Sequence, residues 1–162
     1  YLYSTPAVSR ANRGHELAWY VRARLAAWSW QLFFFNATRF VPDPSGNAEW
    51  NRGAYLVRHL GHCGECHSPR NSLGAVRGDR ELAGNPAGPD GKKIPALRPD
   101  GDADVADWTQ EELETFLDSG MLPDGDFVGA GMGQVITENT GRLTPADRHA
   151  IATYLKALPP MR

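Results

Sequence analysis

The stretch Cys63-Gly64-Glu65-Cys66-His67 decides how this sequence is interpreted, because it contains both cysteines of the chain. Two cysteines in 162 residues cannot build a disulfide scaffold, and cysteines this close together seldom form a structural bridge. The pair indicates a redox-active dithiol, half of a metal site or a covalent attachment point. The histidine that follows favours attachment, since Cys-x-x-Cys-His is the sequence to which c-type haem is joined.

The spacing within this motif has a chemical reason. Each thiol adds across one haem vinyl group, and two intervening residues let one turn of chain reach both vinyl groups. The next residue, His67, is then held under the iron as an axial ligand. Two other interpretations lack support in the sequence: a thioredoxin-like pair requires a strand–helix setting, and a zinc site requires further cysteine or histidine ligands at suitable spacing.

A sixth iron ligand has three methionine candidates, Met121, Met132 and Met161. Met161 follows two prolines next to the end of the sequence, and Met121 follows Gly120 at a predicted helix end. Met132 lies among small residues, which let the backbone approach a flat macrocycle closely. We therefore predict Met132 as the ligand, with Met121 second. An open or histidine-ligated iron remains the alternative.

Helix signals surround the motif at several places. Residues 51–60 are expected to form a helix that ends at Gly61, directly before the cysteines. Thr109 and Glu112 form a capping box at the start of a second helix, flanked by a hydrophobic staple of Trp108 and Leu113. Gly120 is expected to close this helix.

A third helix start is Thr144-Pro145-Ala146-Asp147, with Pro at the first helical position and an acid in the first turn. The apolar face of this helix ends before Pro159 and Pro160.

Between the motif and Thr109, residues 68–107 are rich in Gly, Pro, Asp and Asn and show little periodicity. Such a long irregular stretch is unusual in a compact fold, and we expect it to wrap a large non-protein group.

The first 50 residues are rich in aromatic side chains. Apolar residues at helical spacing from Leu17 to Phe35 predict an amphipathic helix, while Trp30, Phe33 and Phe34 lie off this stripe and need a second apolar surface. Residues 1–6 resemble residues 154–159 at three of six positions, and the chain does not begin with Met. We expect residues 1–7 to be the tail of an earlier copy of the domain in a longer tandem protein.

Composition limits the function classes. The chain is 41% hydrophobic and 22% charged with a formal net charge of −2, as expected for a soluble globular protein. The absence of a basic excess counts against nucleic-acid binding. No uninterrupted apolar stretch is long enough for a membrane-spanning helix.

Residues 51–160 resemble the class I c-type cytochrome domain of diheme and triheme cytochrome c subunits of periplasmic dehydrogenases. The resemblance rests on the attachment motif, on Met132 and on four further segments: Arg52–Val57, Ser68–Asn71, Leu122–Asp126 and Leu143–Asp147. Residues 33–44 also resemble the linker between two haem domains of such subunits.

The resemblance implies an all-α class I cytochrome c fold, with three to four helices around a covalent haem and an aromatic-rich N-terminal extension. The domain would span residues 51–162 and the extension residues 1–50. Gly53–Leu60 and Ala146–Leu158 would cross, and Met132 matches the family's methionine ligand.

The implied function is electron transfer through one haem c, attached to Cys63 and Cys66 and ligated by His67 and Met132. The chain would be no enzyme itself, but would relay electrons from a periplasmic dehydrogenase to a downstream acceptor. The expected location is the periplasm or the periplasmic face of the membrane, since haem is attached there.

The aromatic side chains that lie off the helical stripe suggest a contact surface. Trp30, Phe33 and Phe34 would dock a preceding haem domain, a catalytic subunit or a membrane surface, or fold back on the cytochrome core.

Contacts to the haem edge are a further expectation. Arg70 and Trp108 are candidate neighbours of the haem edge or propionates, together with Lys92 and Lys93. The family usually has a Pro-Asn-Leu segment near the propionates, whereas this chain reads Pro95-Ala96-Leu97. One expected hydrogen bond is therefore in doubt.

Two rival functions follow from the same residues. If Met132 does not bind the iron, an open site could support peroxidase-like chemistry or redox chemistry on small oxyanions. A ligand sensor or structural subunit, whose haem is not rapidly turned over, is the second rival.

Overall fold

The computed structural model describes residues 2–16, 24–88, 91–99 and 104–160. Within these ranges the chain is helical, with three isolated β-bridges and no strand, which confirms the predicted all-α class. The chain divides into two compact units, Tyr1–Thr38 and Arg39–Arg162, and each is described by itself. None of the helices in the described ranges is both long and apolar enough to cross a bilayer.

Unit 1 contains a short 3₁₀ turn, η1 (Leu2–Ser4), and one described helix, α1 (Arg24–Phe34). Helix α1 confirms the second half of the predicted aromatic helix, whereas Leu17 and Val21 lie outside the described residues. No residue of α1 is buried, because the described part of unit 1 contains no other helix that could cover it. Residues 1–7 are the predicted tail of a preceding domain, and Tyr1 among them also lies outside the described residues.

Unit 2 begins its helical structure with α2 (Ala48–Tyr55), three residues before the predicted start. The reason is an N-cap that the sequence analysis missed, since the Asn47 side chain accepts the Trp50 N–H at 2.7 Å. The chain continues without a break into a π-helical turn, η3 (Leu56–Leu60). After Gly61 and His62 it forms α3 (Cys63–His67), which is the attachment motif itself.

The two predicted helix starts of the C-terminal half are confirmed. Helix α5 (Gln110–Ser119) begins with the complete capping box of Thr109 and Glu112 and ends at Gly120. Helix α7 (Pro145–Lys156) has Thr144 as N-cap and Pro in its first turn. Between them lie α6 (Ala130–Glu138) and the 3₁₀ turn η5 (Thr140–Arg142), neither of which the sequence pattern predicts.

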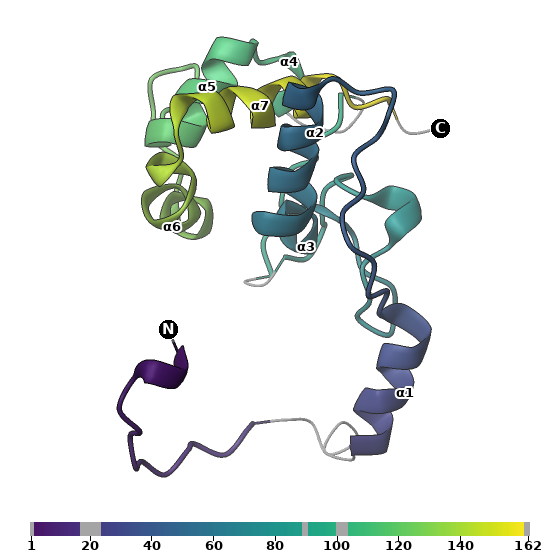
Figure 1. The fold of residues 1–162 in the computed structure, drawn as a ribbon. Helices are drawn as coiled ribbons and strands as arrows, with labels where there is room; N and C mark the ends of the chain where they lie inside the picture. Colours follow the sequence, from purple (N-terminus) through teal and green to yellow (C-terminus); the bar gives the residue numbers. More distant parts are fainter. Residues whose placement is uncertain (1, 17–23, 89–90, 100–103, 161–162) are drawn as a thin grey trace. The chain divides into compact units, whose positions relative to one another are not determined.

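Helices α2 and α7 cross in the core, as the family resemblance implied (Figure 1). Gly53 makes the close approach possible, because a Cβ atom there would overlap the Ala150 carbonyl oxygen and lie 2.6 Å from Tyr154 Cβ. One turn earlier on α2, the ring of Trp50 packs edge-on against Tyr154 at 5.1 Å between centroids. Tyr154 is fully buried in this cluster.

The irregular stretch after the motif is more ordered than its composition predicts. It contains a 3₁₀ turn, η4 (Gly78–Arg80), a short helix, α4 (Asp104–Asp107), and two isolated bridges. Leu82, from the middle of this stretch, is fully buried in the cluster that α2 and α7 share. The stretch therefore supplies core residues of its own.

Candidate haem-binding site

Helix α3 places the three motif side chains together. Residues i, i+3 and i+4 of a helix lie on one face, so Cys63, Cys66 and His67 share a face of α3. Both cysteines are free thiols, with Cys63 half-buried against the core cluster and Cys66 exposed. The helix starts sharply because His62, directly before it, has a left-handed backbone with φ 51°.

Burial raises the pKa of the Cys63 thiol to about 11. A redox-active dithiol needs the opposite, a thiol whose pKa is depressed so that it forms the thiolate. The thioredoxin-like interpretation therefore has no support in the electrostatics. A structural metal site has none either, because the part of the chain that the structure describes contains no group of three metal-ligating side chains.

The orientation of His67 is set by a backbone carbonyl. Its Nδ1 lies 2.8 Å from the Pro95 oxygen, and since a carbonyl can only accept, the Nδ1–H donates. This bond leaves the Nε2 lone pair available for a metal ion. Burial lowers the pKa of His67, partly offset by the hydrogen bond to Pro95, so the neutral, ligating form of the ring is favoured. No sequence pattern predicts this role of Pro95, because the acceptor is a main-chain atom.

Met132 lies in the first turn of α6 and is half-buried. Met121, the second candidate, is 40% exposed and pairs with Phe127 in an isolated bridge. In the view of Figure 1, α6 and α3 lie on opposite sides below α7. The role of Met132 as the second axial ligand stays a prediction.

Arg70 and Trp108 occupy different surroundings. Arg70 closes the chain around the motif, since its guanidinium donates to the Glu65 carboxylate at 2.6 Å and to the Gly74 carbonyl at 2.7 Å. Trp108 is only 9% exposed and packs edge-on against Phe116 at 5.1 Å, in one cluster with Leu113. The shared cluster of Trp108 and Leu113 agrees with the predicted hydrophobic staple. The haem-edge role of Arg70 and Trp108 stays a prediction.

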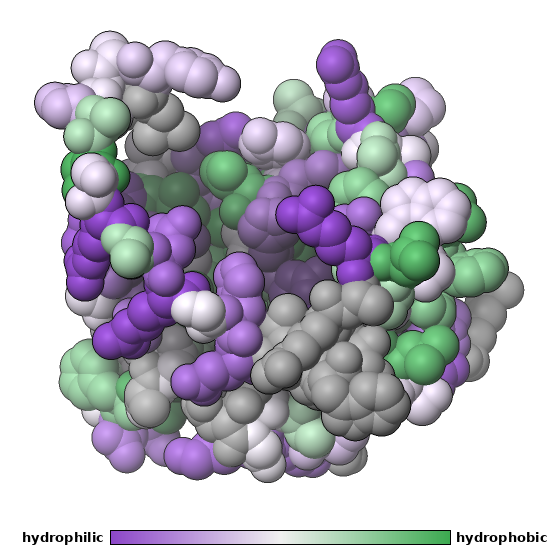
Figure 2. Space-filling model, turned by 90° about the horizontal axis from the view of Figure 1, so that it is seen from below, coloured by the Kyte–Doolittle hydropathy of each residue, from purple (hydrophilic) through white to green (hydrophobic). Residues whose placement is uncertain are grey.

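The residues present fit a covalent haem. Two free thiols and a histidine with an available Nε2 share one short helix. Large apolar side chains that neighbour the motif or Met132 in sequence are exposed, as a surface that contacts a macrocycle would be: Leu60, Leu73, Phe127 and Val135. Exposed hydrophobic residues appear as green areas among purple hydrophilic ones in Figure 2.

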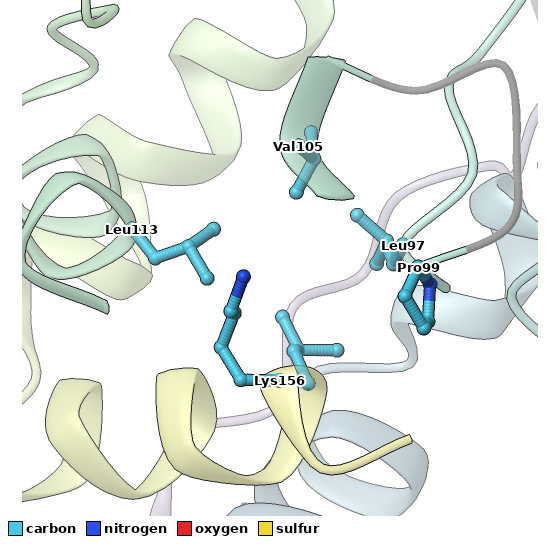
Figure 3. Close-up of a pocket in the computed structure, with 6 residues that line it drawn as sticks. Leu97, Pro99, Val105, Leu113 and Lys156 are labelled. Carbon is cyan, nitrogen blue, oxygen red and sulfur yellow. The ribbon is translucent and has the colours of Figure 1, made fainter. Parts of the chain in front are cut away.

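A cavity of about 20 Å³ elsewhere in unit 2 does not compete with this site. Its lining side chains, from the end of the irregular stretch, α5 and α7, point toward a common space (Figure 3). The Lys156 ammonium borders this space and donates to the Trp108 carbonyl at 2.8 Å. The volume holds no more than about one water molecule.

Comparisons with known proteins give the family context. No family model matches the chain. The chain is 39% identical over 160 residues to a diheme cytochrome c-type protein of Cereibacter sphaeroides, covering 98% of this chain and 52% of that protein. The chain matches a cytochrome c domain of dehydrogenase subunits. The cytochrome c subunit of alcohol dehydrogenase (quinone) from Gluconacetobacter polyoxogenes is 34% identical over 168 residues, covering 99% of this chain and 36% of that protein.

A third relative of the cytochrome c domain belongs to the nicotinate dehydrogenase of Pseudomonas putida. This relative is 36% identical over 159 residues, with 98% of this chain and 13% of that protein covered. The domain thus spans about half the length of the first relative and less of the other two. These relatives are named as a diheme cytochrome c and as a cytochrome c subunit of a dehydrogenase, and both names agree with the predicted electron transfer. The alternative of a haem enzyme with an open iron finds no support among these relatives.

Proposed function

We propose that this chain transfers electrons through one haem c, attached to Cys63 and Cys66, with His67 and Met132 as axial ligands. The observation that carries the proposal is the hydrogen bond from His67 Nδ1 to Pro95, which presents Nε2 as a ligand on the helix face that holds both thiols. When bound, the haem supplies a one-electron couple. A single Cys-x-x-Cys-His motif in the chain supports one haem.

The residues of the chain have distinct parts in this function. The thiols of Cys63 and Cys66 hold the group permanently, even where its edge is exposed. The bond to Pro95 fixes the tautomer and ring orientation of His67. A thioether ligand such as Met132 favours reduced iron and raises the reduction potential.

The partners are a dehydrogenase as electron donor and a downstream protein as acceptor. Support comes from the relatives, which are named as parts of alcohol and nicotinate dehydrogenases. We place the protein in the periplasm or on the periplasmic face of the membrane, where c-type haem is attached.

We further propose that α1 docks a preceding haem domain of the same, longer polypeptide. The helix exposes Trp28, Phe33 and other large apolar side chains, and the described part of unit 1 does not bury them. An isolated helix of 11 residues is marginal in water without such cover. The diheme relative is about twice as long as this chain, which leaves room there for a second haem domain.

Absorption spectra of the haem-loaded chain and two variants test the axial ligands. We expect an oxidised-state sulfur–iron charge-transfer band in the near infrared that is lost in Met132→Ala and kept in Met121→Ala. Loss of the band in Met121→Ala instead would reassign the ligand. Haem without this band in the unmodified chain, together with rapid cyanide binding, would favour the open-iron enzyme.

A further inference from the structure

The carbonyl that orients His67 belongs to an irregular segment, so its position depends on its neighbours. Pro95 follows His67 by 28 residues and has no N–H with which to anchor itself. On one side of it the Ile94 N–H donates to the Asn85 carbonyl at 2.8 Å. On the other side the Leu97 N–H donates to the Leu82 carbonyl at 2.9 Å. The position of the Pro95 carbonyl is thus fixed by hydrogen bonds from its neighbours to residues 81–85, which we call the brace.

The brace also binds the backbone at the ligand itself. The Gly84 N–H donates to the His67 carbonyl at 2.8 Å, and the Leu82 N–H donates to the Ser68 hydroxyl at 2.9 Å. Leu82 adopts a left-handed backbone with φ 62° although its side chain is fully buried. That conformation is unfavourable for a non-glycine residue, so the surrounding contacts must hold it.

Arg98 ties the brace to a distant part of the chain. Its Nε donates to the Glu81 carbonyl at 2.6 Å, and its Nη1 donates to the Pro159 carbonyl at 2.8 Å. These acceptors lie 17 and 61 residues away in sequence. Both are neutral carbonyls reached from one rigid guanidinium, a geometry that a lysine cannot reproduce. Glu81 is held a second time, because its carboxylate pairs with Arg58 of η3 at 2.8 Å.

We propose that Arg98 is a positioning residue for the axial ligand His67. By fixing the brace between α3 and Pro159, which follows α7, it keeps the Pro95 carbonyl within hydrogen-bond distance of Nδ1. This inference rests on the proposed function, in which His67 ligates the haem iron. Arg98 acts through Glu81, Leu82 and Pro95 and touches no ligand atom itself.

The expected effect has a diagnostic sign. Donation from Nδ1–H to a carbonyl makes the imidazole more basic, which favours ferric iron and lowers the reduction potential. Loosening the Pro95 carbonyl therefore raises the potential. Simple removal of a positive charge would instead lower the reduction potential, because a nearby cation disfavours the ferric state. A higher reduction potential in Arg98→Ala would thus indicate lost positioning of His67, whereas a lower potential would indicate only the lost positive charge.

The test compares reduction potentials of the haem-loaded chain by spectroelectrochemistry. In Arg98→Ala we expect a rise equivalent to about a threefold or larger increase in the ratio of ferrous to ferric protein. Arg98→Lys keeps the charge but cannot make both hydrogen bonds of the guanidinium, so its potential should also rise. The matched control is Arg77→Ala, which removes the charge of an exposed arginine paired with Asp79 at 2.6 Å. Its potential should fall slightly or stay unchanged.

A second measurement reports on the hydrogen bond directly. Solvent exchange of the His67 Nδ1 proton, followed by NMR in the reduced protein, should be faster in both Arg98 variants and unchanged in Arg77→Ala. If Arg98→Ala lowers the potential or leaves it unchanged, with unaltered exchange, the inference is wrong. Should Arg98→Ala fail to accumulate as a haem protein, Arg98→Lys decides by the same two criteria. A spectrum of the unmodified chain without histidine–methionine ligation would instead remove the proposed function and this inference together.

Discussion

At the scale of single residues, two contacts show how backbone positions shape this domain. The first is the hydrogen bond from His67 to Pro95, which selects the tautomer that a metal ligand needs. The second is the packing of Gly53, where α2 meets the backbone of α7 without a side chain between them. Both involve main-chain atoms, so each depends on where the backbone lies.

Gly53→Ala is expected to destabilise the domain by about 1–3 kcal/mol, because the added methyl group overlaps the Ala150 carbonyl in a packed core. The haem spectrum should stay unchanged, since Gly53 lies outside the predicted ligand set. Thermal unfolding followed by circular dichroism measures the effect. Gly78→Ala is the control, because its Cβ would meet no atom within 4 Å. Equal stability of the two variants would contradict the close helix crossing.

At the scale of elements, local caps and one ion pair organise the helices. The side chains of Asn47, Thr109 and Thr144 cap the N-termini of α2, α5 and α7. Arg52 of α2 then reaches the first turn of α7, where its Nε lies 2.7 Å from the Asp147 carboxylate. The hydrogen bond from Arg52 lowers the pKa of Asp147. The α2–α7 crossing therefore has an electrostatic link in addition to its apolar core.

The lowered pKa of Asp147 predicts a pH dependence of stability with a defined sign. A depressed folded-state pKa contributes stability that is present above the unfolded value of 3.8 and is lost as the pH falls through the folded value. Asp147→Asn should thus cost less than about 1 kcal/mol at pH 7, since Arg52 is largely exposed. The difference from the unmodified chain should shrink as the pH falls below 3.8 toward the folded value. Urea unfolding at pH 7 and near pH 3 measures it.

Glu138→Gln provides the comparison for this experiment. Its pair with Arg142 is exposed on both sides, at 60% and 67%, and joins only neighbouring turns. We expect a smaller loss at pH 7 for Glu138→Gln than for Asp147→Asn. A loss in Asp147→Asn that is the same at both pH values would show that the carboxylate charge is not what stabilises the crossing.

At the scale of the whole molecule, the chain consists of two units of different character. Unit 2 has a buried core, whereas α1 of unit 1 buries none of its residues. Phe33 is 77% exposed and Phe35 66% exposed. Such a helix is stable only when another surface covers it, which is why we assign it a docking role.

Replacing Phe33 and Phe34 together with Ser should weaken binding of the chain to the proposed preceding haem domain at least about tenfold, because buried aromatic anchors dominate interfaces. The haem spectrum should not change. Calorimetric titration of the two separately produced parts measures the affinity. Val8→Ser, at a position 84% exposed in the same unit, is the control.

Two results would contradict this assignment. If the haem spectrum of the double variant collapses, the two phenylalanines belong to the core of the haem domain. If the double variant binds the haem domain normally but no longer binds vesicles of anionic phospholipid, α1 is a membrane-surface helix instead.

The sequence alone determined the local features of this protein. The capping box of Thr109 and the start of α7 at Thr144 are predicted correctly, because each depends on residues within a few positions of one another. The attachment motif is equally local, and its role in binding haem stays a prediction. The small residues around Met132 led to its choice as the ligand, and the family resemblance agreed with that choice. The resemblance added the helix crossing and the all-α class, and the all-α class is confirmed.

Only the tertiary structure decided how the ligand histidine is held. The hydrogen bond to the Pro95 carbonyl and the two hydrogen bonds of Arg98 have no sequence signature, because they join side chains to carbonyls up to 61 residues away. The left-handed backbone of Leu82 has none either. The pattern of apolar side chains predicts which face of a helix is buried, but it does not predict which carbonyl of an irregular segment will accept a hydrogen bond from His67. The long stretch after the motif was therefore expected to be a wrap, whereas in the structure it also forms the brace for His67.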